Sequence, residues 1–140
     1  MKEIIHAFEV EAPPREVFGA LTTAEGLAGW WTTGVEVDGD LVRFTFEDPF
    51  HPVMRVTERD EARAVVWALE SGHQPWNGST FRFDLQERDG ATAVLFRMSY
   101  GQELPDEQYG VYNFNWAYYL ESLRLLCQEG SGKPFQPAGS

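Results

Sequence analysis

The alternation of apolar and polar residues predicts a meander of β-strands over most of the chain. Residues 3–11 alternate in character, which is typical of a strand with one covered face. From residue 34 to about residue 100, short alternating runs are separated by turn residues, and Asp38-Gly39 and Asp89-Gly90 favour tight hairpins. We expect strands over residues 3–11, 35–37, 41–47, 53–58, 64–70, 80–87 and 92–98.

One alternating set of side chains in the predicted meander is apolar and should share the inner face of the sheet. It comprises Val42, Phe44, Phe46, Met54, Val56, Val65, Trp67, Leu69, Phe81, Phe83, Leu85, Val94, Phe96 and Met98. The opposite set comprises Arg43, Thr45, Arg55, Thr57, Arg82, Asp84 and Arg97. The sheet should therefore be covered on one face and solvated on the other.

Three further segments show helical spacing of apolar residues. The first covers residues 14–21, since proline is tolerated in the first turn of a helix. The second opens at Thr22-Thr23-Ala24-Glu25, which fits a capping box, and runs to Trp30-Trp31. The third is one long helix from Pro105 to about residue 128. Its apolar stripe comprises Tyr109, Tyr112, Trp116, Leu120, Leu123 and Cys127, widened by Tyr119 and Leu126.

Length and charge narrow the class of protein. At 140 residues the chain has the usual size of one domain, so we expect a single domain over residues 1–140. The formal net charge of −11, with no basic stripe, argues against nucleic acid and anionic membranes as partners. Without a long apolar run or a leader peptide, we expect no membrane insertion and a cytoplasmic location. A single cysteine, Cys127, excludes an internal disulfide.

Two sequence motifs resemble a known family. Residues 10–22, which read Val-Glu-Ala-Pro-Pro-Arg-Glu-Val-Phe-Gly-Ala-Leu-Thr, and the following Leu27 and Trp30-Trp31 resemble the opening motif of proteins related to the activator of the heat-shock protein 90 ATPase. Residues 116–123 resemble the motif on that family's terminal helix, with Asn115 in place of the usual glycine. The resemblance spans nearly the whole chain.

The resemblance implies an α+β, START-like or helix-grip fold. In this fold a curved antiparallel sheet of six to seven strands wraps around a long C-terminal helix, with two short helices after the first strand. The family's co-chaperone members pair this domain with another domain that contacts the chaperone, and the sequence holds no counterpart of it. We therefore expect the fold to carry over, but not ATPase activation.

The space between sheet and helix is the predicted binding site, because such spaces hold small ligands. The candidate lining residues are Trp30, Trp31, Phe44, Phe46, Trp67, Phe81, Phe83, Phe96, Met98, Tyr112, Trp116 and Tyr119. The alternative is that these side chains fill the space as a solid core. Because Trp30 and Trp31 are adjacent, they should point about 100° apart on a helix, with only one facing inward.

Polar chemistry is sparse around this space. The histidines His6, His51 and His73 lie in separate segments without metal-site spacing, so no metal or other cofactor is expected. His73, in a loop between strands, is the candidate polar site residue, and no catalytic residue is identified. Phe135, beyond the long helix, is expected to fold back against the body of the domain.

The leading functional hypothesis is binding of a small hydrophobic molecule, aromatic or acyl, in this cavity. A chaperone-associated or stress-related protein-interaction domain is the second hypothesis. The third is an enzyme of the cyclase, dehydratase or hydrolase type that uses the same cavity, although the sequence favours a protein without enzymatic activity. The sequence leaves the oligomeric state open.

Overall fold

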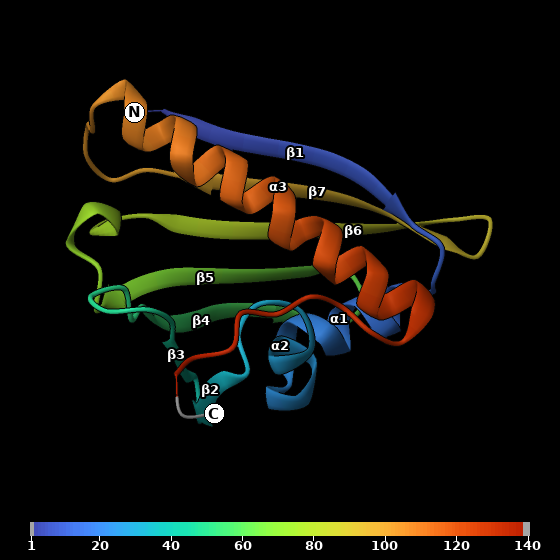
Figure 1. Ribbon diagram of the computed structural model, residues 1–140. Coiled ribbons are helices and arrows are strands. Elements are labelled where there is room, and N and C mark those ends of the chain that lie inside the picture. Colours follow the sequence, from blue (N-terminus) through green and yellow to red (C-terminus); the bar gives the residue numbers. More distant parts are fainter. Residues whose placement is uncertain (1, 139–140) are drawn as a thin grey trace.

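A computed structural model describes residues 2–138 as a seven-stranded antiparallel sheet with helices on one face (Figure 1). The elements are β1 (Glu3–Val10), α1 (Pro14–Thr22), α2 (Ala24–Trp30), β2 (Gly34–Asp38), β3 (Leu41–Thr45), β4 (Val53–Asp60), β5 (Ala64–Ser71), the 3₁₀ turn η1 (Gln74–Trp76), β6 (Thr80–Arg88), β7 (Ala91–Ser99) and α3 (Asp106–Glu129). The predicted α+β helix-grip class is therefore confirmed.

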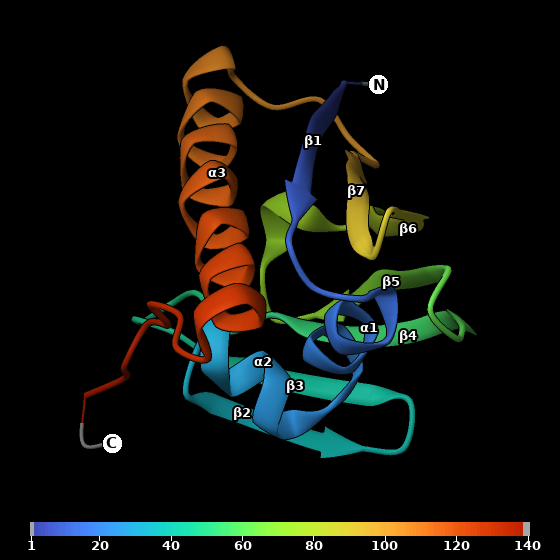
Figure 2. The same cartoon turned by 90° about the vertical axis from the view of Figure 1, so that its right-hand side faces the viewer.

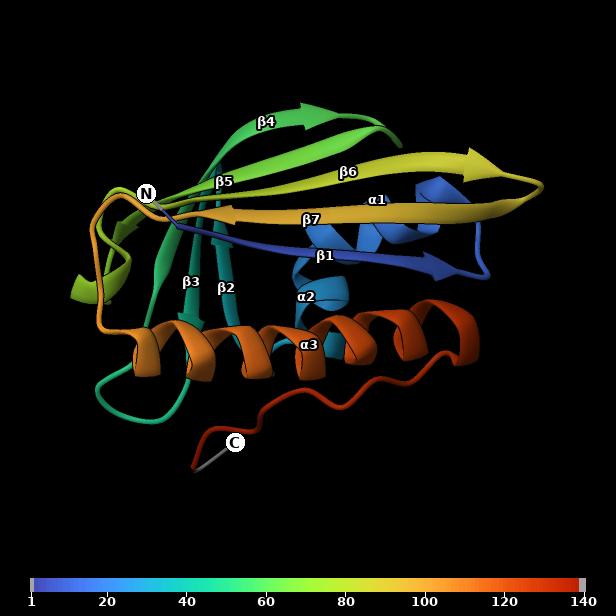
Figure 3. The same cartoon turned by 90° about the horizontal axis from the view of Figure 1, so that it is seen from above.

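The strands follow the order β1-β7-β6-β5-β4-β3-β2. From β2 to β7 each strand pairs with its neighbour in sequence, and only β1 returns to pair with the last strand. The sheet curves from β1 and β7 round to β2 and β3, and α3 lies on its concave side (Figure 2). Both short helices pack against α3; seen from above, α2 lies on the α3 side of the strands and α1 is drawn beneath β6 and β7 (Figure 3).

The concave face carries the core, as the alternation predicts. Phe44, Trp67, Phe81, Phe83 and Phe96 are each at most 1% exposed. The convex face carries charged pairs. The guanidinium of Arg55 binds both carboxylate oxygens of Glu70 at 3.0 and 3.2 Å, and Arg97 reaches Glu3 at 2.8 Å. Because these pairs are solvated, they add little stability but keep this face soluble.

The two short helices are joined by hydrogen bonds at the end of α1. The last carbonyls of a helix have no intrahelical partner. Here the Thr23 hydroxyl donates to the Gly19 carbonyl at 2.8 Å, and the Trp30 indole N–H donates to the Ala20 carbonyl at 2.8 Å. Gly26 allows this close approach, because a Cβ there would lie 2.5 Å from the Ala20 Cα. The two helices thus pack as one unit.

The capping residue of α2 differs from the predicted one by one position. Thr23 is the N-cap, and its hydroxyl accepts the Gly26 N–H at 3.0 Å. Thr22 instead closes α1, where its hydroxyl donates to the Phe18 carbonyl. The capping box read from Thr22 to Glu25 is therefore wrong in register, because α1 continues through Thr22.

The C-terminal tail folds back over the domain, as expected for Phe135. The Phe135 N–H donates to the Trp31 carbonyl at 2.9 Å, and the Thr33 N–H donates to the Phe135 carbonyl at 2.9 Å. The buried Ser122 hydroxyl donates to the Trp30 carbonyl at 2.8 Å and accepts the Lys133 N–H at 2.6 Å. These bonds connect α3, the end of α2 and the tail. Among residues 2–138, no helix has the length and apolar character needed to cross a membrane.

Candidate functional site

A cavity of about 330 Å³ opens between α3, the loops after β3 and β5, and the C-terminal tail. Its walls are mainly aromatic. They comprise Trp31, Phe46, Glu47, Phe50, His73, Trp76, Tyr112, Asn115, Trp116, Tyr119 and Phe135. All of these except Glu47 and Asn115 are buried or half-buried, so the cavity is a recess in the core with polar groups at its rim.

The structure brings about half of the predicted lining residues to this cavity. Those that line it are Trp31, Phe46, Tyr112, Trp116, Tyr119 and the polar candidate His73. Those that lie outside it are Trp30, Phe44, Trp67, Phe81, Phe83, Phe96 and Met98. Around Phe83 the space is filled, because its ring centroid lies 5.0 Å from those of both Trp67 and Phe96. The space between sheet and helix is therefore solid in its middle and open at one end.

The adjacent tryptophans do not behave as helical geometry predicts. Trp30 is 0% and Trp31 is 3% exposed, and their rings stack with centroids 5.9 Å apart. The expectation that only one faces inward is wrong, because the core surrounds the end of α2: the Trp31 ring packs against Phe44 of β3 and Trp116 of α3. Trp30 packs edge-on against Phe83, whereas Trp31 reaches the cavity.

Five lining residues were not anticipated: Glu47, Phe50, Trp76, Asn115 and Phe135. Phe50 and Trp76 come from two separate loops, and the centroids of their rings lie 5.2 Å apart. The two loops approach each other closely at Gly72. A Cβ there would lie only 1.9 Å from the His51 carbonyl oxygen, so only glycine fits. Aromatic residues beside prolines in short loops were the available signal, and alternation could not detect it.

The polar group of the cavity is a pair formed by His73 and Tyr112. The His73 Nε2 lies 2.9 Å from the Tyr112 hydroxyl oxygen, and the imidazole packs edge-on against Phe50 and Trp76. Burial lowers the pKa of His73 below its ordinary value and raises the pKa of Tyr112. Both groups are therefore neutral near pH 7, and the pair can offer a ligand either a donor or an acceptor.

Several indole N–H groups next to this cavity lack an acceptor. Within the described residues, the Nε1 atoms of Trp67, Trp76 and Trp116 are buried and make no hydrogen bond. An unpaired buried donor costs about 1–3 kcal/mol of stability, and such donors are uncommon in protein cores. Trp76 and Trp116 also line the cavity with their rings. The aromatic wall thus maintains ring contacts at the expense of hydrogen bonds.

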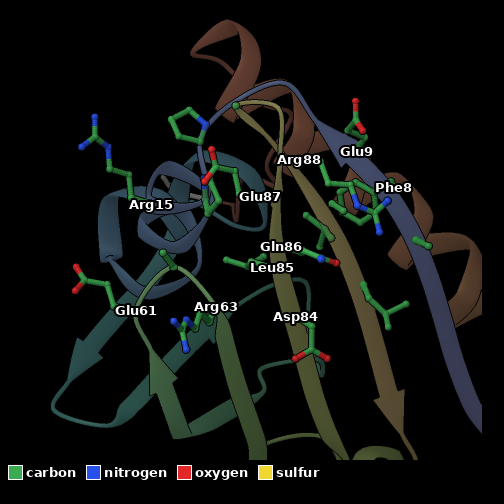
Figure 4. A pocket seen from close by; sticks show the side chains of 18 residues that line it. Phe8, Glu9, Arg15, Glu61, Arg63, Asp84, Leu85, Gln86, Glu87 and Arg88 are labelled. Atoms are coloured by element: carbon green, nitrogen blue, oxygen red, sulfur yellow. The ribbon is translucent and has the colours of Figure 1, made fainter.

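A larger hollow of about 1200 Å³ lies elsewhere, beside the β6–β7 turn and the start of α1 (Figure 4). Its labelled side chains include Arg15, Arg63, Glu61 and Glu87, which come from several elements and carry both signs of charge (Figure 4). Only two of its lining residues are buried, so it is an open depression. The smaller aromatic cavity is the better candidate site despite its volume, because most of its walls are buried or half-buried core residues.

Comparison with known proteins identifies the family. Residues 11–128 match the family described as Activator of Hsp90 ATPase homolog 1-like protein. The solution structure of the Aha1 dimer from Colwellia psychrerythraea is 29% identical, with a TM-score of 0.83 over 94% of this chain and 100% of that one. A search of curated proteins finds no match.

Two more distant structures share the fold alone. SSP2350 from Staphylococcus saprophyticus is 16% identical, with a TM-score of 0.76 over 95% of this chain and 97% of its own. MLL2253 from Mesorhizobium loti is 17% identical, with a TM-score of 0.76 over 89% of this chain and 96% of its own. The family match covers most of the chain and agrees with the motifs at both ends, so this protein belongs to the Activator of Hsp90 ATPase homolog 1-like family.

Proposed function

We propose that this protein binds a small, flat and hydrophobic molecule in the aromatic cavity beside α3. The observation that carries the proposal is a recess of about 330 Å³ with mainly aromatic walls at one end of the core. Ligand pockets usually measure about 300–1,000 Å³, so this cavity suits a ligand of one or two rings or a short acyl group.

The geometry of the tryptophans favours a planar ligand. The rings of Trp31 and Trp116 stack with centroids 5.2 Å apart and planes 27° from parallel. Those of Trp76 and Trp116 are 6.2 Å apart and 21° from parallel. A flat ring that enters beside them continues an existing stack, which is a preferred arrangement of aromatic groups.

The polar pair favours a ligand with one uncharged hydrogen-bonding group. The Tyr112 hydroxyl can donate a hydrogen bond to the His73 Nε2 or to a ligand oxygen, and it can also accept a hydrogen bond from a ligand hydroxyl. Glu47 lies at the rim and the chain carries a net charge of −11, so a carboxylate ligand would be repelled. A phenol or a ketone fits this chemistry better than a fatty acid.

Two matched probes, naphthalene and 2-naphthol, test the proposal. Both should raise the melting temperature and perturb NMR signals of the cavity residues, since binding stabilises the folded state. Tyr112→Phe should lower the affinity for 2-naphthol by about fivefold, because one hydrogen bond contributes about 1 kcal/mol. The affinity for naphthalene should not change. Tyr118→Phe is the control, because Tyr118 is exposed on the same helix outside the cavity. Failure of both probes, with an empty protein in native mass spectrometry, contradicts the proposal.

We also propose that the protein associates with a second copy of itself. The Colwellia structure, 29% identical to this chain, is a dimer, and α3 here carries exposed apolar side chains. Light scattering coupled to size exclusion should therefore give a mass above 15.9 kDa that approaches twice this value as the loaded protein concentration rises. A chaperone-associated role and an enzymatic use of the cavity stay predictions from the sequence.

A further inference from the structure

We propose that two copies of this chain pair through the solvent-facing side of α3, in an antiparallel contact centred on Phe114. This inference rests on the proposed self-association and assigns its surface. We define the outer α3 face as Gly110, Val111, Phe114, Ala117 and Tyr118, all of which are exposed. It lies in the N-terminal half of α3, where no other ribbon covers the side that faces away from the sheet (Figure 2).

The exposure of the large residues on this face is the first observation. Phe114 is 77% exposed, and Val111 and Tyr118 are each 51% exposed. These three are the most exposed large hydrophobic residues in the described part of the chain, and they lie on one helix face. Single exposed apolar residues are ordinary, but a contiguous group of them indicates an interaction surface.

The absence of charge on this part of the helix is the second observation. Between Glu107 and Glu121, α3 contains no charged residue, although 24% of the chain is charged. Interface cores are depleted in charge and enriched in aromatic residues. Two copies that each carry −11 repel one another over most of their surfaces, so an uncharged face is where they can approach. A basic partner, by contrast, would be expected to meet acidic residues.

The spacing on this face suits packing against another helix. Val111, Phe114 and Tyr118 recur at steps of three and four residues, and Leu125 follows Tyr118 by seven. Glu121 lies on the same stripe between Tyr118 and Leu125, and its carboxylate is paired with Arg124. The apolar part of the stripe therefore ends at Tyr118.

The small residues make this face self-complementary. A twofold axis at Phe114 of two antiparallel helices places Tyr118 opposite Gly110 of the second copy, and Val111 opposite its Ala117. Each large side chain then meets a small one, and the two Phe114 rings meet each other. Packing within the chain does not require glycine at position 110, because a Cβ there would meet no heavy atom within 4 Å. Glycine is unfavourable inside a helix, so a close approach by a partner accounts for it.

The size of the face sets the expected strength. Residues 110–118 span only about 12 Å of helix. One helix face of this length buries less than the roughly 800 Å² per partner of a standard interface. We therefore expect a reversible dimer that dissociates on dilution. Sedimentation velocity from low micromolar to hundreds of micromolar protein measures this equilibrium.

Two substitutions test the surface against matched controls. Phe114→Asp should keep the protein monomeric throughout this concentration range and leave its circular dichroism spectrum unchanged, because Phe114 packs against little in its own chain. Gly110→Leu should raise the melting temperature slightly, yet weaken pairing by about tenfold or more. Leu95→Asp is the control, because it puts the same charge at an exposed apolar residue on the convex face of the sheet.

The outcomes separate the two proposals. A wild-type dimer that Phe114→Asp dissociates and Leu95→Asp leaves intact supports the outer α3 face. A wild-type dimer that survives Phe114→Asp overturns the assignment of this surface but not the self-association. A wild-type monomer at every concentration overturns both.

Discussion

Replacing each of the adjacent tryptophans by phenylalanine separates a structural role from a cavity role. Trp30 and Trp31 are both buried and stacked on one another, but of the two indoles only that of Trp30 donates a hydrogen bond, to the Ala20 carbonyl at 2.8 Å. Trp31 instead borders the cavity and is surrounded by rings, with the Phe44 centroid at 4.4 Å and the Trp116 centroid at 5.2 Å. The same chemical change should therefore have different costs at neighbouring positions.

The magnitudes follow from what each change removes. Loss of part of a buried ring costs roughly 1–2 kcal/mol at either site, below the 3–5 kcal/mol typical of truncation to alanine. Trp30→Phe also leaves the Ala20 carbonyl without its donor at the end of α1, which adds about 1–3 kcal/mol. Trp31→Phe enlarges a space that already exists and breaks no hydrogen bond. Trp30→Phe should therefore be the more destabilising by about 1–3 kcal/mol.

Urea unfolding followed by circular dichroism measures both free energies without depending on tryptophan emission. A difference of 1 kcal/mol corresponds to roughly 4 °C in melting temperature for a domain of this size. Trp31→Phe should in addition change the affinity for 2-naphthol, whereas Trp30→Phe should not. Equal costs, or a larger cost for Trp31→Phe, would refute the assigned roles.

Three further predictions concern single side chains. Burial lowers the pKa of His73 from its ordinary 6.5, so its stabilising contribution is full above that pH and is lost as the pH falls through the folded-state pKa. His73→Gln should accordingly lose less melting temperature than wild type on acidification from neutral pH, and equal losses would contradict this. Ser122→Ala removes the hydrogen bonds to Trp30 and Lys133 and should lower the free energy of unfolding in urea by about 1–3 kcal/mol. Hydrogen exchange at the Lys133 amide should also become faster. Unchanged exchange would contradict the role of Ser122 in holding the tail. Burial raises the pKa of Cys127 to about 11, so iodoacetamide should alkylate it far more slowly in the native protein than in urea, and similar rates would argue against its burial.

The secondary structure was readable from the sequence because its causes are local. Alternation, the hairpins at Asp38-Gly39 and Asp89-Gly90, and the stripe from Tyr109 to Cys127 each depend on residues close together in the chain. These features were sufficient to predict seven strands and three helices, and the family resemblance implied their helix-grip arrangement. Errors arose at boundaries, such as the N-cap at Thr23, where two helices compete for the same threonines.

The candidate site depended on features that no local pattern contains. His73 and Tyr112 are 39 residues apart and meet only because the sheet curves around α3. Phe50 and Trp76 belong to loops that are brought together by the close approach at Gly72, and Phe135 reaches the cavity only because the tail folds back.

Sequence pattern thus determined which residues face the interior, because burial follows the period of each element. Whether the interior is filled depends on how ring volumes from different elements add up in three dimensions. Around Phe83 the rings meet and leave no space, whereas between Trp31, Trp76 and Tyr112 they do not. Only the tertiary structure could decide that difference, and it locates the site.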